Sequence, residues 1–157
     1  MLPVNYTKQV LNLSSEMQLR HKISGGDFTR AGNVASSLKK VLQQLNIDHR
    51  QSKRIVIALY EGEVNVVAHA YSAVVDINID SEMVKITITD KGPGIADIEQ
   101  AMKEGYSTAT PQVREMGFGA GMGLSNMKKN SDYMNITSVP GEGTQVEMIN
   151  YIRADAS

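Results

Sequence analysis

Glu61 and Asn65 lie four positions apart in the stretch YEGEVNVVAHAY. On a helix this spacing places the carboxylate and the carboxamide on adjacent turns of one face, so that both address one small volume. A partly desolvated glutamate can take a proton from a water or hydroxyl nucleophile, and an amide oxygen is a suitable ligand for Mg²⁺. The pair alone is more typical of a solvated helix edge, because most polar side chains are exposed.

Asp90 is a second candidate, and two glycines follow it in the stretch DKGPGI. It ends an alternating apolar segment, so its carboxylate projects from a sheet edge before a turn that Gly92 and Gly94 can make. Such a carboxylate can accept a hydrogen bond from an amino group, for example the exocyclic amine of adenine. Thr144, in the stretch GEGT, begins the last expected strand, where its hydroxyl could back the same pocket. Both stretches are also compatible with plain turns.

The stretch MGFGAGMGLSN has a glycine at every second position from Gly117 to Gly123. It is not a dinucleotide loop, because Met122 or Asn126 stands where the third glycine belongs, and the chain has no Gly-Lys pair for a Walker A loop. Glycines that accept positive φ still let backbone N–H groups point at an anion, and a helix beginning near Leu124 adds its positive end. A flexible loop without a ligand is the alternative.

The elements that must position these groups follow from the hydrophobic periodicity. Strands are expected at 17–23, at 75–79 and 84–88 as a hairpin, and at 134–139 and 144–151. Helices are expected at 31–45, 52–72, 95–103 and near 124–131. Asp27 or Thr29 is the expected N-cap of the first helix. The second helix has an apolar stripe made of Val56, Tyr60, Val67 and Tyr71. The predicted fold class is α+β, a two-layer α/β sandwich with a mixed, mostly antiparallel sheet and its helices on one face.

Composition limits the classes of function. With 157 residues and 41% hydrophobic content we expect one domain over 1–157, in which 1–15 are an unassigned N-terminal extension. The net charge of −1 gives no global field that favours nucleic acid or an anionic membrane, so we expect neither as a partner. The absence of cysteine excludes a disulfide framework and fits a reducing compartment, and no apolar segment is long enough to span a bilayer. We therefore expect a cytoplasmic protein.

In chain order, E-x-x-x-N, D-x-G-x-G, the glycine-rich loop and G-x-G-T resemble the four boxes of the ATPase superfamily that groups gyrase, Hsp90, histidine kinases and MutL. Within it, the stretches ITDKGPGI, EGYST and GFGAGMGLSNMKK are similar to the small anti-sigma-factor and switch-type serine/threonine protein kinases of bacterial partner switching. The resemblance covers roughly residues 17–152. It implies a histidine-kinase-like ATPase fold, ATP and Mg²⁺ as cofactors, and a role in pathways such as the stress response.

The resemblance also implies roles for single residues. Glu61 would be the general base, Asn65 the Mg²⁺ ligand and Asp90 the adenine anchor, while Gly92 and Gly94 would form the pocket floor, with Thr144 as a second support. Residues 96–117 would be a mobile lid over ATP. The backbone N–H groups that would contact the phosphates belong to Gly119, Gly121, Gly123 and Leu124. Arg114 is the candidate for extra positive charge at the γ-phosphate, or else a solvated residue of the lid.

The resemblance further implies a partner that carries the phosphate-accepting serine or threonine, a small antagonist protein with the STAS fold. A sigma factor or a PP2C-type phosphatase would be further partners, and a homodimer is consistent with the family. Two other hypotheses stay open. One is a nucleotide-sensing binding module that sequesters a sigma factor or activates a phosphatase with little catalysis, and the other is a scaffold that binds no nucleotide.

Overall fold

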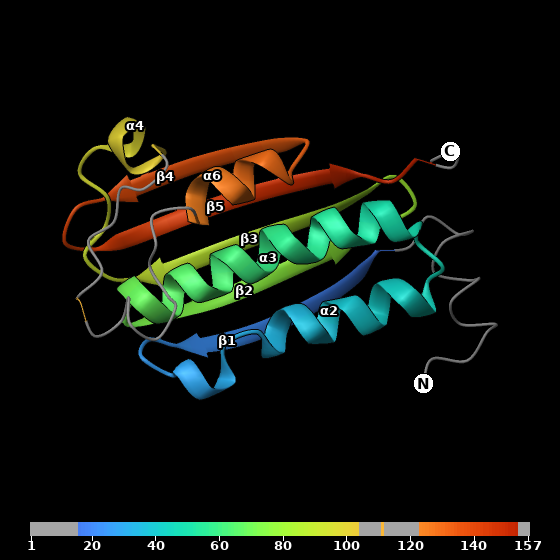
Figure 1. Cartoon of the computed structure of the whole chain (residues 1–157), viewed down its shortest axis with the longest axis horizontal. Coiled ribbons are helices and arrows are strands. Elements are labelled where there is room, and N and C mark those ends of the chain that lie inside the picture. The colour runs from blue at the N-terminus through green and yellow to red at the C-terminus, as the bar shows by residue number, and fades with distance from the viewer. Residues whose placement is uncertain (1–15, 104–110, 112–122, 154–157) are drawn as a thin grey trace.

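A five-stranded antiparallel sheet, covered on one face by helices, forms the fold (Figure 1). The structure is a computed structural model, and it describes residues 16–103, 111 and 123–153. The strands run in the order β1-β2-β3-β5-β4, and every neighbouring pair is antiparallel. The strands are β1 (Met17–Ser24), β2 (Ser72–Ile79), β3 (Met83–Lys91), β4 (Tyr133–Val139) and β5 (Gly143–Tyr151). The predicted fold class is confirmed.

The helical layer lies on one side of this sheet, with α2 and α3 side by side and α6 next to α3 (Figure 1). A single 3-10 turn, η1, precedes α2, and the short α4 follows β3. None of the helices in the described ranges is both long and apolar enough to cross a membrane. The helical elements are η1 (Phe28–Arg30), α2 (Asn33–Gln44), α3 (His49–His69), α4 (Ile98–Ala101) and α6 (Gly123–Lys129).

The core lies between the two layers. Alternate residues of β2 and β3 are buried, as the period of two predicts, and they face the apolar sides of α2 and α3. The opposite face of the sheet has no helix in front of it in the described part of the chain and carries mostly polar side chains. Ile86 and Ile88 on β3 and Leu59 on α3 are among the side chains with at most 2% of their surface exposed.

The start of α2 differs from the prediction. The N-cap is Gly32, with φ of 99°, and neither Asp27 nor Thr29 caps the helix. The Thr29 hydroxyl instead donates to the Asp27 carboxylate at 3.0 Å, within and beside the η1 turn. The first N–H groups of α2 still need acceptors. The side chain of Glu63 on α3 supplies these acceptors, because its two carboxylate oxygens accept the N–H groups of Val34 and Ala35.

The predicted apolar stripe of α3 is partly wrong. Tyr60 is 42% exposed, and Tyr71 lies beyond the helix end and is 73% exposed, while Val67 is buried as expected. Because α3 packs against α2, α6 and the sheet at once, its buried surface extends around more of the helix than a single stripe. The residues that are buried along α3 are Ser52, Ile55, Ala58, Leu59, Gly62, Glu63, Val66 and Val67.

The predicted helix at 95–103 is shorter in the structure, where α4 spans Ile98–Ala101. The Asp97 side chain caps it by accepting the N–H of Gln100 at 3.1 Å. The remaining elements lie within a few residues of their predicted bounds. Of the predicted lid, residues 96–103 and 111 are described, and the other lid residues lie outside the described ranges, as does the extension 1–15. The lid and the single-domain organisation stay predictions.

Candidate functional site

Close packing at Gly62 sets the position of α3 over the sheet. A Cβ atom added to Gly62 would collide with Ile88 Cδ1 of β3 and would lie 3.2 Å from Met127 Cε of α6. A larger residue at this position would therefore require the ends of the Ile88 and Met127 side chains to move. Glu61 precedes this contact point and Asn65 follows it by one turn, so both residues are carried by a rigidly packed segment.

Glu61 and Asn65 direct oxygen atoms toward the same point at the start of α6. A Cβ atom on Gly123 would lie 3.9 Å from Glu61 Oε2 and 4.0 Å from Asn65 Oδ1. The amide of Asn126, one turn further along α6, donates a hydrogen bond of 3.4 Å from its Nδ2 to Glu61 Oε1. The first turn of α6 thus faces the carboxylate and the carboxamide of α3, which the sequence spacing predicts to share one volume.

Asp90 and Thr144 meet where β3 ends and β5 begins. Asp90 continues the inward-facing row of Val84, Ile86 and Ile88, and its Oδ1 accepts the backbone N–H of Thr144 at 3.1 Å. The Thr144 and Ser138 hydroxyl oxygens are 2.9 Å apart. Ser138 Oγ also donates to the Gly143 carbonyl at 3.0 Å, so its one proton is used and Thr144 is the donor between them. The lone pairs of Thr144 Oγ1 remain available to a ligand.

The glycines of this region allow three backbone segments to approach one another. A Cβ atom on Gly92 would lie 3.1 Å from Ala70 Cα, and one on Gly94, whose φ is 74°, would lie 2.5 Å from the Val139 carbonyl oxygen. A Cβ on Gly143 would collide with the Asp90 carbonyl oxygen. Larger residues at these positions would separate the end of α3, the end of β3 and the β4–β5 turn.

The segment after β3 is also held by hydrogen bonds to the β4–β5 turn. The Gly92 N–H donates to the Glu142 carbonyl at 3.1 Å, and the Gly141 N–H donates to the Pro93 carbonyl at 2.7 Å. The Ile95 N–H donates to Ser138 Oγ at 2.7 Å. These hydrogen bonds therefore hold the chain in place up to Ile95, the last residue before the predicted lid.

Burial changes the acidity of the two half-buried carboxyls. Desolvation raises the pKa of Glu61 above its ordinary value, and the hydrogen bond from Asn126 partly offsets this. Desolvation likewise raises the pKa of Asp90, offset in part by the Thr144 N–H. A carboxylate with a raised pKa is a better proton acceptor, which suits Glu61 to general-base chemistry.

The comparison with known proteins agrees with this geometry. Residues 26–150 match the family described as the histidine kinase-like ATPase domain. The chain belongs to this family. The predicted resemblance is therefore confirmed, and the domain description indicates use of ATP.

Two named proteins are similar in sequence to this chain. The chain is 39% identical over 101 residues to the anti-sigma F factor of Pasteuria penetrans, covering 60% of this chain and 64% of that protein, just under two thirds of its length. It is 30% identical over 119 residues to the serine/threonine-protein kinase RsbT of Bacillus subtilis, covering 73% and 84%. These names agree with the enzyme class expected from the sequence.

A solved structure shares the fold. It contains the RsbU and RsbW domains of a Mycobacterium tuberculosis protein, and it aligns with a TM-score of 0.60 and 17% identity over 87% of this chain and 32% of that one. At this identity the likeness concerns the fold alone.

The donor set of the site is compatible with a nucleotide that carries Mg²⁺. No cluster of three or more His, Cys, Asp or Glu side chains that could hold a metal ion occurs among the described residues. Mg²⁺ in nucleotide sites usually has only one or two protein ligands, because phosphate oxygens and waters complete its octahedron. Asn65, facing Gly123, can supply such a single ligand.

The structure places the described predicted site residues in two groups. Glu61, Asn65, Gly123 and Leu124 lie at the α3–α6 side, and Asp90, Gly92, Gly94 and Thr144 lie at the sheet end. Leu124 itself is buried, so only its backbone could serve a ligand. Gly119, Gly121 and Arg114 lie outside the described residues.

Three contributing residues were not predicted. Asn126 could have been found from the sequence as the polar residue one turn after Gly123, and Gly143 as the second glycine of GEGT. Ser138 had no signal, because it occupies an ordinary inward position of an alternating strand.

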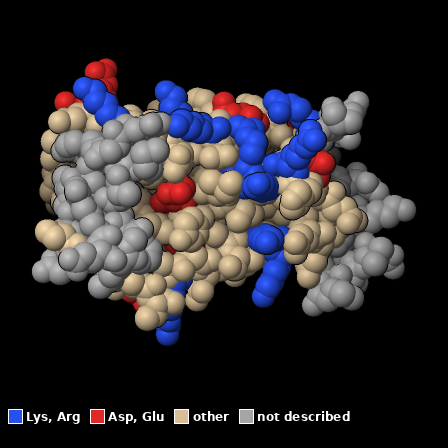
Figure 2. All heavy atoms as spheres, in the orientation of Figure 1, with Lys and Arg blue, Asp and Glu red and all other residues tan. Residues whose placement is uncertain are grey.

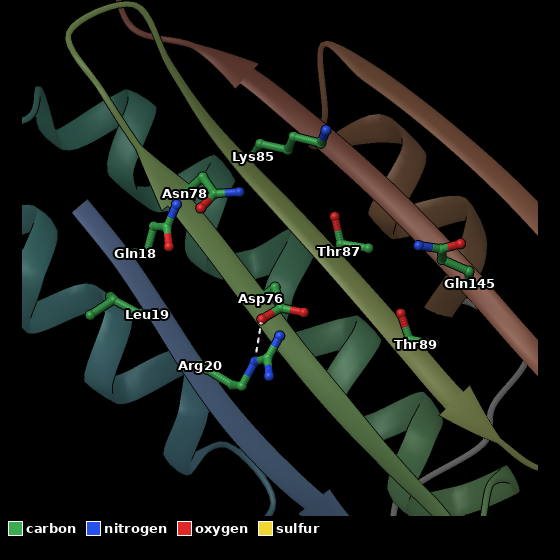
Figure 3. Close-up of a pocket in the computed structure, with 9 residues that line it drawn as sticks. All are labelled: Gln18, Leu19, Arg20, Asp76, Asn78, Lys85, Thr87, Thr89 and Gln145. Atoms are coloured by element: carbon green, nitrogen blue, oxygen red, sulfur yellow. Dashed lines mark hydrogen bonds and ion pairs between the residues drawn. The ribbon is translucent and has the colours of Figure 1, made fainter. Parts of the chain in front are cut away.

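A shallow groove on the uncovered face of the sheet is separate from this site (Figure 3). Its walls come from β1, β2, β3 and β5, and an ion pair of 2.7 Å joins Arg20 Nε to Asp76 Oδ1 across two strands. None of the predicted site residues lines it. The groove is lined by Gln18, Leu19, Arg20, Asp76, Asn78, Lys85, Thr87, Thr89 and Gln145.

Proposed function

We propose that this protein is an ATP- and Mg²⁺-dependent serine/threonine protein kinase that acts as an anti-sigma factor or switch kinase in bacterial partner switching, with a STAS-domain antagonist as its substrate. The observation that carries the proposal is the convergence of Glu61 Oε2 and Asn65 Oδ1 on one point at Gly123. The names of the relatives, an anti-sigma F factor and a serine/threonine-protein kinase, support it.

In this mechanism Glu61 is the general base. It takes the proton of the acceptor hydroxyl as that oxygen forms a bond to the γ-phosphorus, while the bond from phosphorus to the bridging oxygen breaks and ADP leaves. The raised pKa of Glu61 favours the transfer, and Asn126 orients the carboxylate. Mg²⁺, bound through Asn65, would neutralise negative charge on the phosphates.

The other residues bind the nucleotide. Asp90 accepts a hydrogen bond from the adenine amine through Oδ2, because Oδ1 already accepts the Thr144 N–H. The Thr144 hydroxyl supports the same pocket. Gly92 and Gly94 keep this floor open. We further propose that the backbone N–H groups of the glycine run contact the phosphates and that Arg114 adds positive charge there; these are Gly119, Gly121, Gly123, Leu124 and Arg114.

The test is phosphoryl transfer from radiolabelled ATP to the STAS-domain protein encoded in the same genome, in the presence of Mg²⁺. Wild-type protein should label a serine or threonine, whereas Glu61→Gln and Asn65→Ala should not. Glu82→Gln, the same change at an exposed position in the β2–β3 turn, is the matched control and should retain full activity. Undiminished transfer by Glu61→Gln would show that Glu61 is not the base.

The same experiment separates the kinase from a binding module. Titration of ATP in parallel, with and without Mg²⁺, measures nucleotide binding independently of transfer. Binding of ATP and of a sigma factor without any transfer would instead support a nucleotide-sensing module that sequesters its partner.

A further inference from the structure

Basic side chains gather on the helical face, over the N-terminal half of α3 and the end of α6 (Figure 2). Two hydrogen bonds connect the N-terminal half of α3 to the end of α6 and to the segment after β5. Arg54 Nη2 donates to the Lys129 carbonyl at 3.4 Å, and Gln51 Nε2 donates to the Arg153 carbonyl at 3.1 Å. We call this group the basic patch. It consists of Arg50, Lys53, Arg54, Lys128, Lys129 and Arg153.

Two acidic residues near the basic patch, Asp48 and Asp132, already accept hydrogen bonds. Asp48 caps α3 by accepting the N–H groups of Arg50 and Gln51 at 3.0 and 3.2 Å. Asp132 accepts from Arg54 Nη1 at 3.0 Å and from the Tyr151 N–H at 2.8 Å. Even when the exposed Glu82 is included, whose carbonyl accepts the Ile152 N–H beside Arg153, the patch has more cations than carboxylates.

The uncovered face of the sheet shows the opposite arrangement. There Arg20 pairs with Asp76 at 2.7 Å across neighbouring strands (Figure 3). Lys85 of β3 pairs with Glu147 of β5 at 3.5 Å. In the described ranges no ion pair includes Lys53 or Lys128, and both are exposed. In a chain whose net charge is −1, an excess of cations such as Lys53 and Lys128 on the helical face creates a local positive field.

Most of the basic patch lies on the same two helices, α3 and α6, that carry Glu61, Asn65 and Gly123 of the candidate site. Lys128 follows Gly123 by five residues of the same helix, which is about 7.5 Å at the α-helical rise. Lys53 precedes Glu61 by eight residues of α3, about 12 Å by the same measure. A protein that rests on the patch would place neighbouring parts of its surface at the acceptor position beside Glu61.

We propose that the basic patch is the docking surface for an acidic face of the protein substrate, next to the serine or threonine that it presents to Glu61. The inference rests on the proposed kinase function. It adds the place where the protein substrate binds and the negative charge of the substrate surface that binds there. A protein fits better than a nucleic acid, because Asp48 and Asp132 interrupt the positive charge and would face a phosphate backbone.

The first test measures KM for the STAS-domain substrate with a charge reversal on the patch, Lys53→Glu with Lys128→Glu. KM for the protein substrate should rise about tenfold or more, with kcat and the KM for ATP unchanged, because charge pairs at an interface act on encounter and specificity. The matched control is Lys39→Glu with Lys40→Glu on α2, which changes the charge equally at exposed positions away from the patch. Thermal melts check that both variants fold.

The second test needs no catalysis. Fluorescence anisotropy measures binding of a labelled poly-L-glutamate peptide, of duplex DNA and of vesicles containing anionic lipid. The acidic peptide should bind the wild type and the α2 control, should lose affinity for the patch variant, and should weaken as salt is added. Tighter, patch-dependent binding of DNA or vesicles would overturn the proposal in favour of that class of partner.

The two tests separate the inference from the proposed function. Phosphoryl transfer with an unchanged protein KM in the patch variant would reject the docking surface and leave the kinase intact. Patch-dependent binding of the acidic peptide without transfer by the wild type would reject the kinase and keep the surface as an acidic-protein site. Equal effects of the patch and α2 reversals would show a general charge effect and reject the surface.

Discussion

Glu61 and Glu63 lie two positions apart on α3 and occupy opposite environments. Glu61 is partly exposed, and one weak hydrogen bond of 3.4 Å from Asn126 reaches its carboxylate. Glu63 is 1% exposed, and its two oxygens accept the N–H groups of Val34 and Ala35 at 3.1 and 3.0 Å. Two positions along the helix therefore separate the Glu61 carboxylate, which can still accept a proton, from the Glu63 carboxylate, which holds α2 and α3 together.

The difference shows how one helix combines chemistry with stability. Glu63 replaces the missing side-chain cap of α2, since Gly32 at the N-cap has no side chain to offer. In this way the position and rotation of α3 are fixed relative to α2. Glu61 is held in place by that fixed helix, and among the described residues only the weak hydrogen bond from Asn126 occupies its carboxylate, which leaves it able to accept a proton.

The largest expected effect tests the chemical side of this comparison. Glu61→Gln should lower kcat for phosphoryl transfer by about 10²- to 10⁴-fold, the usual contribution of a general base. Stability should not fall. A carboxyl whose pKa is raised by folding contributes stability below its unfolded pKa and loses it as pH rises through the folded pKa, so the neutral amide is at no disadvantage at pH 7. Quench-flow and thermal melts measure the two quantities.

Glu63→Ala tests the structural side. Two buried N–H groups would lose their acceptor, and the free energy of unfolding should fall by about 3 kcal/mol. Urea denaturation followed by circular dichroism measures it. Glu63→Gln retains one acceptor and should cost less. If Glu63→Ala lost under 1 kcal/mol while abolishing activity, the division between the two carboxylates would be refuted.

Asp90 extends the comparison, because it is half-buried like Glu61. Asp90→Asn keeps an acceptor for the Thr144 N–H but places an amide donor toward the adenine amine. Affinity for ATP should fall by about 10- to 100-fold, the value of a charge-assisted hydrogen bond, with little change in GTP affinity. Isothermal titration with both nucleotides provides the check, and an equal loss for GTP would argue against adenine recognition by Asp90.

The smallest effect concerns Asn126. Its hydrogen bond lowers the pKa of Glu61 against the larger effect of desolvation, so Asn126→Leu should raise that pKa further. Because the base must be ionised, the acid limb of kcat/KM against pH should move to higher pH, while the Glu82→Gln control keeps the wild-type profile. A shift to lower pH would mean that another group controls this limb.

Much of the fold could be predicted because its signals are local. The alternation in β1, β2 and β3 and the helical spacing in α2 follow from which side chains meet the core, and the spacing of Glu61 and Asn65 follows from the helical repeat. The turn glycines Gly92 and Gly94 could also be predicted, since the backbone there must approach other segments closely.

The rest depended on contacts between distant segments. No periodicity predicts that Glu63, a charged residue, is buried, because its partners are backbone groups of another helix. The exposure of Tyr60 depends on where α2 lies. Ser138 joins the site because β5, rather than β4, pairs with β3 and so brings the β4–β5 turn beside Asp90, a strand order that the sequence does not specify.

The strand order β1-β2-β3-β5-β4 has a consequence for synthesis on the ribosome. Asp90 and Thr144 are separated by 54 positions, and the strand that carries Thr144 pairs with β3 only after the chain has returned through β4. A nascent chain that already contains Glu61, Asn65 and Asp90 therefore lacks half of the pocket floor. If Asp90 and Thr144 bind the nucleotide as proposed, the complete pocket forms only after β5 has left the exit tunnel, and a chain truncated before β5 should not bind ATP.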